Sequence, residues 1–109
     1  MKNTAVNLNT VNVNIQQLRY FLDLASTLSF SRTAENFNIS QVAVTHQIQN
    51  LESKLGARLF ARTKRHVDLT PAGRVFVEEA HSLIAKIEDA VDKTRSAALG
   101  ISGTLSVGF

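Results

Sequence analysis

The chain has 109 residues, a formal net charge of +3 and no cysteine, with 44% hydrophobic and 19% charged residues. This length allows one modest core and excludes a barrel or doubly wound enzyme, while the composition is typical of a soluble globular protein and excludes disorder throughout. No apolar run reaches the roughly 18 residues of a membrane span, and the first residues lack a signal-peptide pattern. The lack of cysteine excludes disulfides and thiolate metal sites. We therefore expect a cytoplasmic protein with no membrane partner.

Positive charge is concentrated in the first two thirds of the chain. Residues 1–70 carry eight basic and four acidic side chains, whereas residues 71–109 carry four basic and five acidic ones. Four of the basic residues lie between Arg58 and Arg65 with no acid among them. A nucleic-acid surface and an ordinary solvated loop explain this cluster equally well on charge alone.

The first half of the chain predicts a flexible start followed by two helices. Residues 1–14 are rich in Asn, Thr and Val without a helical period, which is typical of a tail. Apolar residues then recur at steps of three and four and predict a helix over residues 15–28. We expect Ser31 to cap a second, short helix that ends at Asn38. Its inward residues would be Ala34 and Phe37.

A third helix should follow, capped by Ser40 and ended by Gly56. The connection around Asn38 is so short that the second and third helices must meet at a steep angle, which is the helix-turn-helix geometry. One side of the third helix carries an apolar stripe, made of Val44, Ile48, Leu51 and Leu55. The side toward solvent or a ligand carries Gln41, Thr45, His46 and Gln49.

After Gly56, residues 59–60 and 67–69 predict two short strands around the basic turn 62–66. Such a hairpin would be the wing of a winged helix-turn-helix. A plain hairpin that closes the core is the alternative. The apolar residues of both strands serve the core in either case.

Thr70 and Pro71 are typical of a helix start and predict a long helix over residues 71–98. At 1.5 Å per residue it would reach about 42 Å, which is more than a domain of this size can cover, so part of it needs a partner. Residues 99–109 predict a hinge and a strand that stops at the chain end. A heptad seam runs along the helix through Phe76, Ala80, Leu83, Ile87, Ala90 and Thr94.

Three segments together resemble the amino-terminal region of LysR-type transcriptional regulators. They are LRYFLDLASTLSFSRTAENFNISQ (18–41), HQIQNLESKLGARLFART (46–63) and LTPAG (69–73). The resemblance implies a mainly α fold, with a winged helix-turn-helix over residues 15–70, a linker helix over 71–98 and the start of an effector-binding domain over 99–109.

The same resemblance implies the partners. We expect binding to double-stranded DNA at an interrupted dyad operator, as a homodimer through the linker helix and as a tetramer when full length. It implies no cofactor in this fragment and a small-molecule effector bound by a carboxy-terminal domain that the chain does not contain.

The resemblance also assigns roles to residues of helix 40–55, the wing 60–68 and the linker helix. Base readout is expected from Gln41, Val42, Thr45, His46, Gln49 and Arg65. Contact with the DNA backbone is expected from Ser31, Arg32, Ser40, Gln47, Arg62 and Lys64. The dimer interface is expected at Phe76, Ala80, Leu83, Ile87 and Ala90. An inert solvated face is the alternative for the helix, phosphate contact alone for Arg65, and a simple cap for Ser31.

The third helix departs from the family pattern at three positions. Val42, Thr45 and His46 stand where relatives often have proline, serine and arginine. Gln41 keeps an amide that can bond adenine N6 and N7, whereas His46 cannot form the two-pronged bond of arginine to guanine. We therefore expect a base preference that differs from that of arginine-bearing relatives.

The sequence gives little support for other classes of function. The three histidines are too dispersed for a metal site, and nothing resembles a nucleophile elbow or an acid–base pair, so we expect no enzyme. A winged helix used as a protein–protein interaction module is the alternative from another class. It needs apolar anchors on the wing, whereas this wing carries Arg62, Lys64 and Arg65, which favours DNA.

Overall fold

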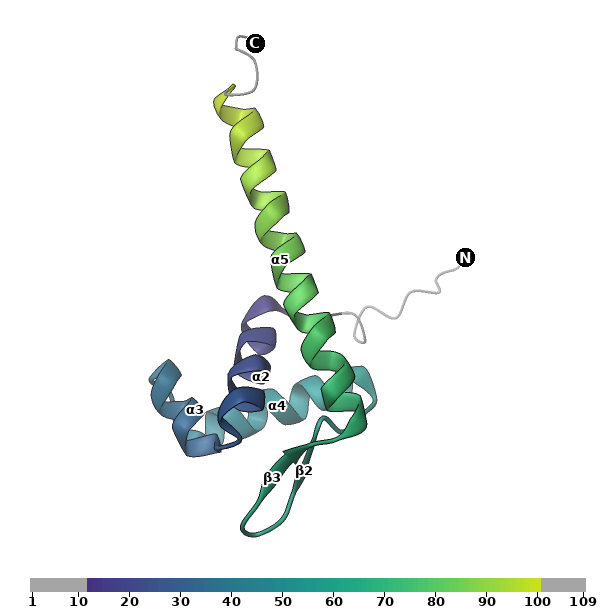
Figure 1. Ribbon diagram of the computed structural model, residues 1–109. Coiled ribbons are helices and arrows are strands. Elements are labelled where there is room, and N and C mark those ends of the chain that lie inside the picture. Colours follow the sequence, from purple (N-terminus) through teal and green to yellow (C-terminus); the bar gives the residue numbers. More distant parts are fainter. Residues whose placement is uncertain (1–11, 101–109) are drawn as a thin grey trace.

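The computed structural model of the protein describes residues 12–100. Its elements are α2 (Ile15–Thr27), α3 (Phe30–Phe37), α4 (Gln41–Leu55), β2 (Phe60–Arg62), β3 (Val67–Leu69) and α5 (Pro71–Leu99). In Figure 1, α2 lies against the first turns of a long helix, α5, and α3 and α4 pack against α2. The other end of α5 extends away from these helices, while a two-stranded hairpin projects on the opposite side. This is the predicted mainly α, winged helix-turn-helix fold.

The start of α2 corrects the expectation of a tail over residues 1–14. Asn14 caps the helix, because its side chain accepts a hydrogen bond from the backbone N–H of Gln17 at 2.8 Å. The Gln17 side chain in turn faces the backbone N–H of Asn14 at 3.4 Å, which completes a capping box. Val13 packs against the core. Residues 13 and 14 therefore belong to the fold, and residues 1–11 lie outside the described part of the chain.

The start of α3 corrects a second expectation. The cap is Ser29, whose hydroxyl accepts from the backbone N–H of Arg32 at 3.1 Å, whereas Ser31 lies within the first turn. Leu28 causes this difference because it takes the left-handed conformation, with φ 53°, and ends α2 there. The next residue then has the extended backbone that an N-cap requires.

The helix-turn-helix itself agrees with the prediction. Asn38 ends α3 with φ 57°, and Ser40 caps α4 by accepting from the backbone N–H of Ala43 at 3.0 Å. Gly56 ends α4 with φ 71°. The stripe residues Val44, Ile48 and Leu51 are fully buried, and Leu55 is half-buried.

The first turns of α5 belong to the core of their own chain. The Phe76 ring lies 5.1 Å from the ring of Phe21, measured between centroids, and Ala80 is fully buried. Both residues were expected on the seam between two copies. Helical periodicity alone cannot distinguish a second copy from α2, which is the element that covers these turns. The exposed part of the seam therefore begins at Leu83.

The hairpin closes the base of the molecule. Strands β2 and β3 pair antiparallel, with Phe60 opposite Leu69 and Arg62 opposite Val67. Leu59 and Phe60 are buried, so the root of the hairpin serves the core as expected. Within residues 12–100, no helix combines the length and the apolar character that crossing a membrane requires.

Gly73 allows α5 to start directly against the hairpin. A β-carbon at this position would overlap the carbonyl oxygen of Leu59 and lie 2.8 Å from Leu69 Cδ2. We expect Gly73→Ala to lower the free energy of unfolding by about 1 to 3 kcal/mol, because the backbone must shift. Glycine to alanine within a helix otherwise adds stability. Urea unfolding measures the change, and an unchanged or higher midpoint would contradict the close approach.

Candidate nucleic-acid interface

Helix α4 presents a polar face at its amino-terminal half. Ser40 fixes where the helix starts, and the buried stripe turns the remaining side chains outward. The exposed predicted readers on this face are Gln41, Val42, His46 and Gln49, and Thr45 and Gln47 are half-buried. Val42 is 64% exposed, so a large apolar side chain stands in solvent between polar neighbours. Such a side chain is suited to contact a thymine methyl group.

The wing places its positive charge at the tip. The turn between β2 and β3 is closed by a hydrogen bond from the Thr63 N–H to the His66 carbonyl oxygen at 2.8 Å. Lys64 and Arg65 are exposed within this turn. His66 Nε2 lies 2.8 Å from Asp68 Oδ2, so the histidine next to the tip is held by its own strand. The charges of the tip thus belong to Lys64 and Arg65.

A cleft of about 420 Å³ lies between the start of α3, the start of α4 and the wing. It brings together three predicted base readers and three predicted backbone contacts from segments far apart in the sequence. They are Gln41, Thr45 and Arg65, with Ser31, Arg62 and Lys64. Val42, His46 and the remaining predicted residues of α3 and α4 do not line this cleft. Helix α4 and the wing therefore form one continuous surface, on which Arg62, Lys64 and Arg65 supply the positive charge.

Arg62 is not the open, solvated arginine that the sequence suggests. Its side chain is 25% exposed, its guanidinium lies 4.8 Å from the centroid of the Phe30 ring, and its Nη2 lies 4.0 Å from Glu52 Oε1. The arginine therefore has both an aromatic and an anionic neighbour before any ligand arrives.

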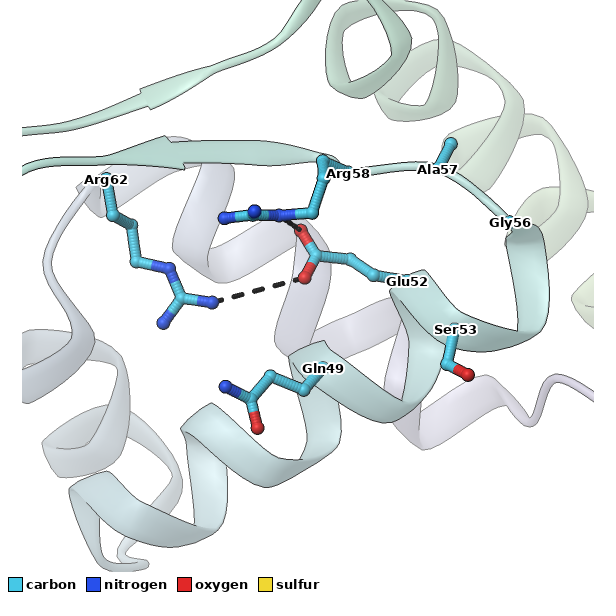
Figure 2. Close-up of a pocket in the computed structure, with 7 residues that line it drawn as sticks. All are labelled: Gln49, Glu52, Ser53, Gly56, Ala57, Arg58 and Arg62. Atoms are coloured by element: carbon cyan, nitrogen blue, oxygen red, sulfur yellow. Dashed lines mark ion pairs between the residues drawn. The ribbon is translucent and has the colours of Figure 1, made fainter.

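Glu52 is the residue that sequence reasoning missed. It is 6% exposed, and its Oε2 accepts hydrogen bonds from the backbone N–H groups of Leu59 at 2.8 Å and Phe60 at 3.2 Å. Figure 2 shows Glu52 reaching from α4 toward Arg58 and Arg62 across a cleft of about 530 Å³ that Gln49 also lines. A signal existed, because Glu52 stands four residues after Ile48 and hence on the apolar stripe. An acid on that stripe must find buried donors.

Gln17 is another buried polar side chain without a predicted role. It is 3% exposed, and its Nε2 donates to Asn50 Oδ1 at 2.8 Å. This hydrogen bond connects α2 to the carboxy-terminal half of α4. Within residues 12–100, no group of His, Asp or Glu side chains is arranged to hold a metal ion.

Comparisons with known proteins agree with this geometry. Residues 15–74, more than half of the chain, match the sequence profile described as "Bacterial regulatory helix-turn-helix protein, lysR family". The uncharacterized HTH-type transcriptional regulator YnfL of Escherichia coli (strain K12) is 40% identical over 99 residues, which are 91% of this chain and 33% of YnfL.

Similar solved structures include complexes with DNA. The complex of the BenM DNA-binding domain with catB site 1 DNA has a TM-score of 0.74 and 35% identity, over 81% of this chain and 95% of that one. Full-length CbnR complexed with its target DNA has a TM-score of 0.76 and 34% identity, over 81% of this chain and 31% of that one. The chain thus spans about a third of YnfL and of full-length CbnR. It belongs to the LysR family of bacterial regulatory helix-turn-helix proteins.

Proposed function

We propose that the chain is the sequence-specific DNA-binding domain of a transcriptional regulator. The observation that carries this proposal is the cleft in which the polar start of α4, the start of α3 and the cationic wing meet. A major groove of about 12 Å admits one helix, and a hairpin beside that helix reaches the adjacent minor groove and backbone. The DNA complexes formed by the similar BenM and CbnR proteins support the same use of this fold.

Most of the residues proposed to contact DNA bases lie on α4. Gln41 can bond both N6 and N7 of adenine, and Thr45 can give a hydroxyl bond and a methyl contact to thymine. Val42, His46 and Gln49 extend the same exposed face along the helix. Gln47, at the edge of that face, and Ser40, whose hydroxyl caps α4, are proposed to contact phosphates.

The start of α3 and the wing would hold the backbone and a minor groove. Ser31 and Arg32 lie in the first turn of α3, where backbone N–H groups and the positive end of the helix favour a phosphate. Lys64 would neutralise a phosphate, and Arg65 would enter a minor groove narrowed by A·T steps.

A second copy would complete the operator-binding unit. The apolar side chains that line a shallow cleft on α5 include Ile87, Ala90 and Val91, far along the helix from the core of the chain. We propose that they pair with the same helix of another copy, which fits an interrupted dyad operator. A carboxy-terminal effector domain and a tetramer are proposed for the full-length regulator, which would act in the cytoplasm where bacterial DNA lies. The support for this last step is the span of the chain, about a third of full-length CbnR.

Selection of bound duplexes from a random pool tests the proposed function directly. We expect a pair of related half-sites to emerge, and a pool that remains random would overturn sequence-specific recognition.

Arg65→Ala tests the wing. We expect weaker binding together with a loss of A·T preference at one flanking position of each half-site, because arginine is favoured in narrow minor grooves. Arg74→Ala on α5 is the matched control, since it removes the same charge from an exposed position that lines neither this cleft nor the apolar cleft on α5. Gel-shift titration of sequence variants at fixed salt measures both effects. Equal losses from the two substitutions would show that Arg65 contributes only general charge.

A further inference from the structure

Arg62 lies at the boundary of the two clefts. It lines the one between helix and wing, and it also lines the one around Glu52. Its contacts with the Phe30 ring and with Glu52 Oε1 hold the guanidinium from two sides. Because the side chain stays 25% exposed, part of its donor set remains open to a ligand.

The two oxygens of Glu52 have different partners. Oε2 accepts both backbone hydrogen bonds from the root of the wing and lies 3.7 Å from Nε of the exposed Arg58, while Oε1 faces Arg62. The two backbone bonds fix the orientation of a side chain that is itself nearly fully buried. Oε1 therefore points toward Arg62 as a consequence of how the wing is attached to α4.

We propose that Glu52 is a positioning residue for DNA binding, which acts by holding the Arg62 guanidinium ready for a backbone phosphate. This inference rests on the proposed function. A solvated arginine must lose much of its rotamer freedom when it binds, whereas a guanidinium already held between an acid and a ring has lost it beforehand. Arginine has five donors, so the ones turned away from Glu52 remain available to phosphate oxygens.

Because Glu52 is negatively charged, the proposal predicts a change in DNA affinity opposite to the one that charge alone would cause. A carboxylate near the DNA repels phosphates, so on charge alone its removal must strengthen binding and steepen the salt dependence. Positioning requires the opposite change in both quantities. The direction in which affinity changes when Glu52 is replaced therefore distinguishes a positioning residue from a side chain that only repels phosphates.

Glu52→Gln removes the negative charge that faces Arg62, and with it the ion pair to the exposed Arg58. Comparison with the same change in an Arg62→Ala background separates the two contributions. The amide oxygen can take the place of Oε2 and accept both backbone bonds, while an uncharged amide NH₂ then faces Arg62 in place of the carboxylate oxygen that lies 4.0 Å away. We expect an affinity for the selected duplex about three- to tenfold lower, because one charge-assisted phosphate contact is lost or weakened. The slope of log K against log salt should become shallower by up to about 0.9.

Two further variants make the result specific. Glu79→Gln gives the same change in charge and residue type on the exposed face of α5. Its affinity should stay within about twofold of wild type, because Glu79 is exposed to screening by salt and lines neither of the two clefts. In an Arg62→Ala background, Glu52→Gln should weaken binding no further, because a residue that acts through Arg62 has nothing left to hold.

The fold of Glu52→Gln is checked by the protection of the Leu59 and Phe60 amides from hydrogen exchange. If that protection is lost, Arg62→Lys decides instead, since it keeps the charge but not the planar fork, and its affinity should fall by a similar factor. A folded Glu52→Gln protein that binds as tightly as wild type, or more tightly, overturns the proposal. So does equal weakening in the Arg62→Ala background, or a wild-type affinity of Arg62→Lys. Failure of wild type itself to bind duplex DNA would overturn the proposed function as well.

Discussion

Leu83→Asp should turn a dimer into a monomer and lower the affinity for a two-half-site operator by about a hundredfold or more, because the second half-site would no longer be bound at high effective concentration. Leu83, Ile87 and Val91 follow each other at steps of four along α5 and are 47%, 41% and 39% exposed. Figure 1 shows this part of α5 extending beyond the other helices. An apolar stripe in that position needs a cover, and a carboxylate at its start would be buried without a partner.

Ala85→Asp is the matched control for this experiment. It places the same side chain on the same exposed helix but about 200° around the axis from Leu83, at about 100° per residue. Light scattering at tens of micromolar protein gives the mass, and gel-shift titration gives the affinity. A monomeric wild type, or a Leu83→Asp protein that still dimerises, would contradict the proposed interface.

Local signals predicted most of the fold. The caps Ser40 and Gly56 and the apolar periodicity of α4 act within a few residues of the chain, so they could be recognised without knowledge of the tertiary structure. The prediction failed at the start of α3, where two serines compete. Ser29 caps the helix because Leu28 ends α2 in a left-handed conformation. This conformation is uncommon outside glycine and asparagine, and no local sequence pattern predicts it at a leucine.

The remaining errors concern pairs of elements. A heptad pattern on α5 shows which side is apolar, but it cannot show that α2 covers Phe76 and Ala80 while Leu83 stays exposed. The role of Glu52 was missed for the same reason. Its donors are the backbone N–H groups of Leu59 and Phe60, which reach it only after the wing has folded onto α4. Periodicity thus predicted which side chains of α4 face outward, but it could not predict the buried contacts that support the proposed site.

His46→Arg should change which base the protein prefers, with guanine favoured at one position of each half-site by about 1 to 3 kcal/mol. His46 is exposed on α4, one turn beyond Val42 and next to Thr45. An imidazole cannot engage guanine O6 and N7 together, whereas the guanidinium fork can. At about 1.4 kcal/mol per factor of ten, the expected preference is about five- to 150-fold over the wild-type base.

The matched control is His81→Arg, which adds the same charge on the exposed side of α5. Selection from a random duplex pool, run in parallel on wild type and both variants, separates three outcomes. A new guanine in the His46→Arg sites alone places this residue in direct base readout. Tighter binding of the same sequences would instead make it a phosphate contact, because the added charge would act without regard to the base. Identical selected sequences and affinities in all three proteins would remove His46 from the interface and leave specificity to Gln41 and Thr45, the readers that line the cleft beside the wing.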